Sequence, residues 1–141
     1  MKDVTVVVSL GPNIDVSQLG VIPSNFIIKK FIPQLEVLKK AEIFISHAGN
    51  NSLNESLSFG VPLVLCPQQG EQTTAARQFH KKGVAVNTAS KCPSSTVILE
   101  AVNTILSDSS YRREAIKASV ALENARNNES ISRVISSYLQ V

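Results

Sequence analysis

Short apolar runs alternate along the first two thirds of the chain with segments whose apolar positions recur at helical spacing. The apolar runs are rich in β-branched residues and lack a regular alternation of polar and apolar positions. This pattern is typical of strands that are covered on both faces in a parallel sheet. We predict five such strands, at Val4–Ser9, Asn25–Lys29, Glu42–Ser46, Val61–Cys66 and Val84–Val86. Residues 14–24, between the first two, contain Gly20 and Pro23 and predict a loop with at most one helical turn.

The segments between the later strands predict short helices, at Gln34–Lys40, Asn51–Phe59 and Glu71–Lys82. Gly60 and Gly83 directly follow the last two, at the position where glycine most often ends a helix. Beyond Pro93 the pattern is helical, and its first segment has an apolar stripe at the spacing i, i+1, i+4, i+5. We predict three helices there, from Ser94 or Ser95, from Ser109 to about Ala125, and from Asn127 or Asn128.

Strands that alternate with helices imply right-handed crossovers and a parallel sheet. We therefore predict an α/β fold with a doubly wound, Rossmann-like parallel sheet, followed by C-terminal helices. No linker, repeat or low-complexity segment interrupts the sequence, so residues 1–141 are expected to form a single domain. Ligands of such sheets bind beyond the carboxyl ends of the strands, where several polar turns are predicted.

One of these turns lies in the stretch Ile43–Glu55, IFISHAGNNSLNE. A buried strand is followed by a turn of small and polar residues and then by the start of a helix. The first backbone N–H groups of a helix have no internal partner, and the helix dipole is positive there, so this arrangement binds anions. Because the turn carries almost no charge, the backbone itself would hold the anion.

Several side chains of this stretch suit an anion site. His47 directly follows the strand, where its imidazole can reach a phosphate oxygen, and Gly49 allows a close approach to the backbone. Asn51 and Ser52 would supply free N–H groups and side-chain donors. Glu55 lies one turn further on, where its carboxylate can accept hydrogen bonds from a ribose diol. The same composition is also typical of plain helix capping, with Glu55 as a favourable first-turn charge.

Three residues near other strand ends have both a functional and an ordinary interpretation. Phe31 stands next to a strand and could stack on a base, although a lone aromatic residue more often belongs to the core. Glu71 and Gln72 open another helix and could hold sugar hydroxyls, although a first-turn Glu is also ordinary dipole chemistry.

Composition and motifs exclude several classes of protein. The formal net charge is +3, and the basic residues form nothing longer than pairs, which argues against a nucleic-acid-binding surface. No apolar run approaches the roughly 20 residues that span a bilayer. Cys66 and Cys92 form no pattern typical of a disulfide scaffold, so we expect a reducing, cytoplasmic location. The histidines and cysteines lack metal-ligand spacing, and the usual dinucleotide and P-loop glycine motifs are absent.

Taken together, the polar positions form a pattern that is known from one family. FIPQLEVL (Phe31–Leu38) and FISHAGNNSLNESLSFGVPLVLCPQQGEQ (Phe44–Gln72), with Thr74–Gln78 at the matching spacing, resemble the donor-binding signature of family 1 UDP-glycosyltransferases. The resemblance is strongest to the bacterial macrolide-type branch, which has the two-domain GT-B fold. It covers nearly the whole chain, and its motif H-x-G-x-N-S-x-x-E is highly specific.

The resemblance implies a role for each matching residue. Phe31 stands where the family usually has a tryptophan that stacks on uracil, and a phenyl ring can still stack, with less area. Gln34 stands where the base is read. His47 matches the histidine that contacts the donor diphosphate. Asn50 stands at a position that varies among bacterial members, so it says little about the choice of sugar.

The remaining matches concern the phosphates and the two sugars. Asn51 and Ser52 match residues whose donors hold the phosphates, and Glu55 matches the glutamate that takes the ribose hydroxyls. Glu71 and Gln72 match the acidic residue and the glutamine that hold the transferred sugar. The resemblance implies a UDP-sugar as substrate and no other cofactor. It also implies no metal, because these donors are amides and an imidazole rather than a D-x-D pair.

Two parts of the family's pattern have no counterpart in the sequence, the first βα unit of the donor domain and the N-terminal acceptor domain that carries the histidine base. The resemblance therefore implies the donor-binding domain of a hexosyltransferase for small-molecule hydroxyl acceptors, without a catalytic residue of its own and inactive alone. Its expected partners are a UDP-sugar, an acceptor domain in the same or another chain, and a second copy at the incomplete sheet edge. Three alternatives stay open: the donor-binding subunit of a two-chain transferase, half of a UDP-sugar epimerase, and a non-catalytic UDP-binding module.

Overall fold

The computed structural model describes residues 4–127 of the chain. The chain divides into two compact units, Met1–Val37 and Leu38–Val141. All five predicted strands are present, and every strand pair is parallel. Among the described residues, no helix is both long and apolar enough to cross a membrane.

The first unit contains a two-stranded parallel sheet. Its strands are β1 (Val6–Ser9) and β2 (Phe26–Lys29). The loop between them is as predicted, with one 3-10 turn at Val16–Leu19. Asp15 caps this turn, because its carboxylate accepts a 3.0 Å hydrogen bond from the Ser17 backbone N–H. The short helix α1, Gln34–Leu38, begins in this unit.

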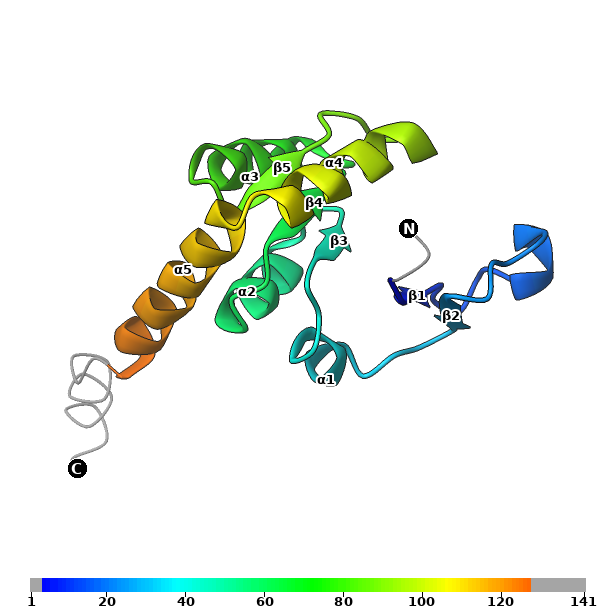
Figure 1. The fold of residues 1–141 in the computed structure, drawn as a ribbon, viewed down its shortest axis with the longest axis horizontal. Coiled ribbons are helices and arrows are strands. Elements are labelled where there is room, and N and C mark those ends of the chain that lie inside the picture. Colours follow the sequence, from blue (N-terminus) through cyan, green and yellow to red (C-terminus); the bar gives the residue numbers. More distant parts are fainter. Residues whose placement is uncertain (1–3, 128–141) are drawn as a thin grey trace, which may run out of the picture. The chain divides into compact units, whose positions relative to one another are not determined.

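The second unit is built on a three-stranded parallel sheet in the order β3–β4–β5. Its strands are β3 (Phe44–Ser46), β4 (Leu63–Leu65) and β5 (Ala85–Asn87). Its helices are α2 (Asn50–Ser58), α3 (Gly70–Lys81), α4 (Ser95–Ser107) and α5 (Ser110–Asn127). A helix follows each strand, and Figure 1 shows this alternation through the unit.

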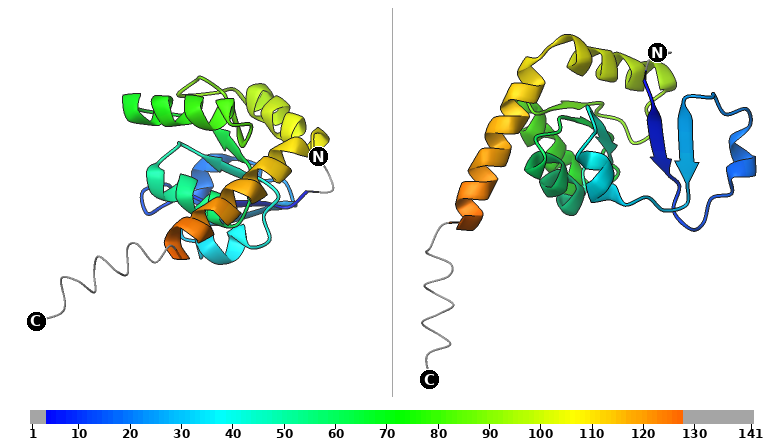
Figure 2. Two further views of the ribbon diagram at one scale, coloured as in Figure 1. Left: turned by 90° about the vertical axis from the view of Figure 1, so that its left-hand side faces the viewer. Right: turned by 60° about the horizontal axis from the view of Figure 1, so that its bottom comes forward.

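Helices cover both faces of this sheet, because neighbouring residues of a strand point to opposite faces. On the central strand β4, Leu63 and Leu65 belong to a core that includes residues of α2, α3 and α5. Val64, between them, packs instead with the buried stripe of α4. Figure 2 shows α5, coloured yellow to orange, continuing from the end of α4 and running alongside α2. The sheet is therefore doubly wound, as predicted.

The predicted ends of the elements differ from the observed ends by no more than two residues. Strand β4 is shorter than predicted, because Pro62 has no N–H for a ladder and the Val61 N–H bonds to the Ser56 carbonyl at 3.0 Å. The helix predicted from Asn127 or Asn128 lies outside the described residues. The single domain predicted for residues 1–141 stays a prediction.

Candidate anion site at the end of strand β3

The turn between β3 and α2 reverses the chain within three residues, 47 to 49. Ala48 achieves this with a φ of 69°, in the left-handed region that residues other than glycine rarely enter. Its side chain is buried, and its N–H donates a 3.3 Å hydrogen bond to the Ser46 hydroxyl. Backbone held in such an unusual conformation is found most often at functional sites.

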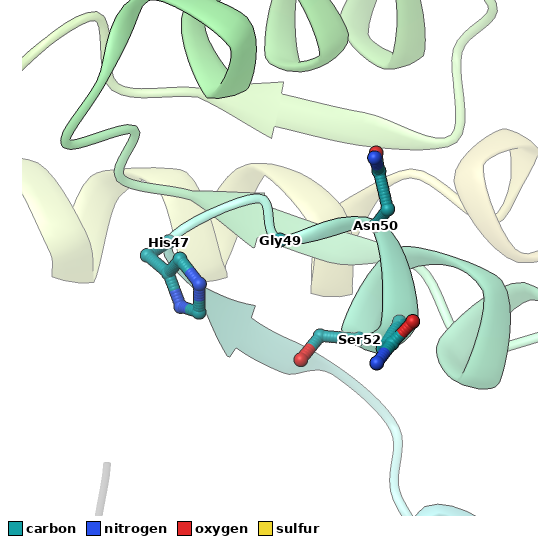
Figure 3. Close-up of a pocket in the computed structure, with 5 residues that line it drawn as sticks. His47, Gly49, Asn50 and Ser52 are labelled. Atoms are coloured by element: carbon teal, nitrogen blue, oxygen red, sulfur yellow. The ribbon is translucent and has the colours of Figure 1, made fainter.

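Gly49 is the N-cap of α2 and has ordinary extended backbone angles, φ −69° and ψ 139°. Any residue could adopt these angles, so the reason for glycine is spatial. The His47 imidazole occupies the place of a side chain here, because a Cβ on Gly49 would come within 2.6 Å of its Nε2 and 3.2 Å of its Cε1. Figure 3 shows the ring beside the turn that contains Gly49.

Gly49 also leaves the start of α2 without a side-chain cap. The first hydrogen bond of the helix runs from the Leu53 N–H to the Gly49 carbonyl at 3.0 Å. The N–H groups of Asn50, Asn51 and Ser52 precede it and therefore have no acceptor within the helix. Together with the positive end of the helix dipole, these N–H groups provide a binding place for an anion.

The same residues line a cavity of about 390 Å³. Its lining consists of His47, Gly49, Asn50, Asn51 and Ser52. Figure 3 shows the His47 imidazole and the Ser52 hydroxyl on one side of the turn, whereas the Asn50 side chain points the other way. The volume lies near the lower end of the range of about 300–1,000 Å³ that is typical of small-molecule sites, so a small anionic group suits it.

The cavity unites part of the predicted site. Of the predicted residues, it includes His47, Gly49, Asn51 and Ser52. Glu55 lies one turn along α2, is half-buried and is not among the lining residues.

The other predicted residues lie on other elements. Glu71 and Gln72 are in the first turn of α3, after β4, and do not line the cavity. The ends of β3 and β4 lie side by side, because the Cys66 N–H donates a 2.8 Å hydrogen bond to the Ser46 carbonyl. Phe31 and Gln34 belong to the first unit, where the Phe31 side chain is 72% exposed.

Two glutamines form a network that the sequence analysis did not identify. The Gln72 Oε1 accepts hydrogen bonds from the backbone N–H groups of Gln68 and Gln69, at 2.9 and 3.2 Å. The Gln68 Nε2 donates to the carbonyls of Cys66 and Lys91, at 3.0 and 2.6 Å. The contact of Gln72 with the Gln69 N–H has a sequence signal, because glutamine three residues after the N-cap is typical of a capping box. The contact with Lys91, on the loop after β5, has none.

Cys66 stands between β4 and this network. Burial raises the pKa of its thiol, and a hydrogen bond with the Thr88 side chain acts in the opposite direction. Within residues 4–127, no group of three or more His, Cys, Asp or Glu side chains is placed to hold a metal ion. The donors lining the cavity are backbone N–H, imidazole, amide and hydroxyl groups.

Residues 15–132 match the protein family described as UDP-glucoronosyl and UDP-glucosyl transferase. Because this match covers most of the chain, the chain belongs to the UDP-glycosyltransferase family, as the sequence pattern predicts.

Two curated relatives are enzymes of one bacterium. The chain is 37% identical over 123 residues to the uncharacterized UDP-glucosyltransferase YojK of Bacillus subtilis, and 43% identical over 103 residues to the NDP-glycosyltransferase YjiC of the same bacterium. These alignments cover 87% and 73% of this chain, but only 30% and 26% of the relatives. The chain therefore spans about a third or less of the length of the curated relatives it matches.

Solved structures show the same relationship. The glycotransferase of kitacinnamycin superposes with a TM-score of 0.84 at 25% identity, over 94% of this chain and 34% of its own. The calicheamicin glycosyltransferase CalG4 superposes with a TM-score of 0.79 over 94% of this chain and 35% of its own, and at 24% identity it supports the fold alone. The predicted GT-B-type α/β fold is thereby confirmed.

Proposed function

We propose that this chain supplies the donor-binding part of a UDP-sugar-dependent hexosyltransferase that acts on a small hydroxyl acceptor. The observation that carries the proposal is the uncapped start of α2 beside the His47 imidazole, in one cavity. Relatives named UDP-glucosyltransferase support a UDP-sugar as the ligand. The activity of the complete enzyme is part of the proposal, because the chain spans only about a third of its relatives' length.

The donor diphosphate is the group that we place in the cavity. Its oxygens accept hydrogen bonds from the Asn51 and Ser52 N–H groups, from the Ser52 hydroxyl and from the His47 imidazole. During transfer, the acceptor oxygen bonds to the anomeric carbon, and the bond from that carbon to the diphosphate oxygen breaks. The electron pair stays on UDP, where donors that are already in place stabilise the growing negative charge.

The acceptor proton needs a base, and we place it in an acceptor domain rather than at His47. His47 lies beside the helix start, where it serves as a donor to the diphosphate. The chain alone is then inactive, and a measurable rate of transfer by the isolated chain would overturn this part. We also propose that the chain self-associates through an edge of its sheet.

The remaining residues are assigned by their place in the family's pattern. Glu55 would accept hydrogen bonds from the ribose hydroxyls, one turn beyond the phosphate-binding N–H groups. Glu71 and Gln72 would hold the transferred sugar, and Phe31 and Gln34 would bind the uracil base. No metal is required in this scheme, because amide, imidazole and hydroxyl donors stabilise the charge of the diphosphate by hydrogen bonding. A cytoplasmic location suits the two free cysteines.

An NMR titration of the ¹⁵N-labelled chain tests the donor site. UDP is expected to shift the amide signals of residues 47–55 and of the start of α3, whereas uridine, which has no phosphate, is expected to bind far more weakly. Ser52→Ala should weaken UDP binding about fivefold, the effect of one lost hydrogen bond. Ser58→Ala, at the far end of the same helix, is the matched control. Shifts that avoid residues 47–55, or equal affinity for uridine and UDP, would refute the proposal.

A further inference from the structure

Gln68 is exposed, but its hydrogen bonds connect several segments at the carboxyl edge of the sheet. Its side-chain Nε2 donates to the Cys66 carbonyl on its own loop and to the Lys91 carbonyl on the loop after β5. Its backbone N–H donates to the Gln72 Oε1 at the start of α3. A single residue thus joins two loops and a helix start.

The loop that carries Lys91 is itself held to the sheet, through Thr88. Thr88, three residues earlier, donates to the Leu65 carbonyl from its N–H at 2.9 Å and from its hydroxyl at 3.1 Å. The loop after β5 is therefore tied to the end of the central strand. Gln68 therefore ties the loop after β4 to a loop that is itself bonded to the sheet.

The Gln72 amide has a fixed polarity in this arrangement. Its Oε1 accepts from two backbone N–H groups, those of Gln68 and Gln69, and a carbonyl oxygen has two lone pairs. The Nε2 group is left for a ligand, and this group can only donate. The neighbouring Glu71 carboxylate can only accept when it is ionised.

We propose that Gln68 is a positioning residue for the sugar end of the donor site, and that it holds Gln72 so that its amide donates to a hydroxyl of the transferred hexose. This inference rests on the proposed function. It predicts a site that distinguishes the hydroxyls of the sugar by hydrogen-bond direction, with Gln72 as the donor and Glu71 as the acceptor. Gln68 itself does not touch the sugar in this scheme.

The test compares the affinities of the full 141-residue chain for UDP and for UDP-glucose. Gln68→Met has a side chain of similar length without an amide, and its backbone N–H remains. We expect it to reduce the preference for UDP-glucose over UDP about fivefold, with the dissociation constant of UDP itself unchanged within twofold. Gln68→Lys keeps a side-chain donor for the two carbonyls and should restore the preference. Gln78→Met, in the last part of α3, is the control for the same substitution elsewhere.

A second variant separates the helix cap from contact with the sugar. In Gln72→Glu, the carboxylate still accepts from the Gln68 and Gln69 N–H groups, so the melting temperature should not fall. It cannot donate, so the preference for UDP-glucose should fall as in Gln68→Met. The added negative charge weakens the binding of UDP at least as much as that of UDP-glucose, because UDP carries more negative charge. Charge repulsion therefore cannot lower the preference for UDP-glucose.

The outcomes distinguish this inference from the proposed function. If the wild-type chain fails to bind UDP, the proposed function and the inference are both overturned. If UDP binds, but Gln68→Met lowers only the melting temperature and leaves the preference for UDP-glucose unchanged, the inference alone is overturned. If Gln68→Met does not fold, Gln72→Glu decides, and an unchanged preference there overturns the inference.

Discussion

Gly49→Ala should impair donor binding while leaving the fold intact. A Cβ at this position would lie 2.6 Å from the His47 Nε2, so the ring must move by roughly 1 Å to regain ordinary contact. The ring is the end of a side chain with two free torsions, so moving it strains the fold little. Alanine is a poorer N-cap than glycine, and we expect the substitution to destabilise the chain by about 0.5–1 kcal/mol in total.

The loss in affinity should be larger than the loss in stability. A hydrogen bond from the imidazole to a charged diphosphate contributes about 1.5–3 kcal/mol. Displacing the ring should therefore raise the dissociation constant of UDP by roughly 10- to 150-fold. Isothermal titration calorimetry with UDP measures this effect, and thermal denaturation measures the stability. Gly70→Ala is the matched control, because a Cβ on Gly70, the first residue of α3, meets open space.

A double-mutant cycle shows whether Gly49 acts through His47. In a His47→Ala background the ring is absent, so Gly49→Ala should weaken UDP binding by no more than about twofold. The coupling energy between the two substitutions should then be nearly as large as the effect of either one alone. If Gly49→Ala has the same effect with and without the imidazole, glycine serves another purpose there, and the spatial argument is wrong.

Three further predictions concern single side chains. Glu55→Ala should weaken UDP binding by about 1–3 kcal/mol, through two hydrogen bonds lost to the ribose; unchanged affinity in calorimetry would remove Glu55 from the site. At pH 8 a maleimide should modify the exposed Cys92 well before Cys66, whose thiol pKa is raised by burial; mass spectrometry of Cys66→Ser and Cys92→Ser chains shows the order, and equal rates would contradict it. The Asp108 carboxylate accepts a 2.8 Å hydrogen bond from the Ser110 N–H at the start of α5, and this bond lowers its pKa. Its stabilising effect is therefore present at neutral pH and is lost as the pH falls through that lowered pKa. Asp108→Ala should therefore lower the melting temperature at pH 7, and by less as the solution is made more acidic; a difference that does not shrink as the pH falls would argue against this linkage.

The secondary structure of the second unit could be predicted closely because local rules decide it. Leu63, Val64 and Leu65 are fully buried in one run, which is the pattern of a central strand with helices on both faces. Ser94 caps α4 by accepting from the Val97 N–H, as a serine before an amphipathic segment predicts. Such signals lie within a few residues of the element they specify.

The inner geometry of the site could not be predicted in the same way. Glycine is the usual residue in the left-handed region, so no sequence signal places that conformation at Ala48 rather than at Gly49. The contact between Gln68 and Lys91 joins residues that are 23 positions apart, and it depends on the two loops being brought together by adjacent strands. Periodicity and capping rules contain no information about contacts of this kind.

Two choices of residue in the turn after β3 are unfavourable by local rules, and both make sense if an anion binds there. A serine at position 49 would cap α2 better than a bare glycine, but it would engage the N–H groups and would collide with the His47 ring. A glycine at position 48 would relieve the positive φ, but it would remove a methyl group from the core around Leu53 and Leu57. Natural chains depart from local rules mainly where function requires it. These two choices of residue therefore support the proposed anion site at the start of α2.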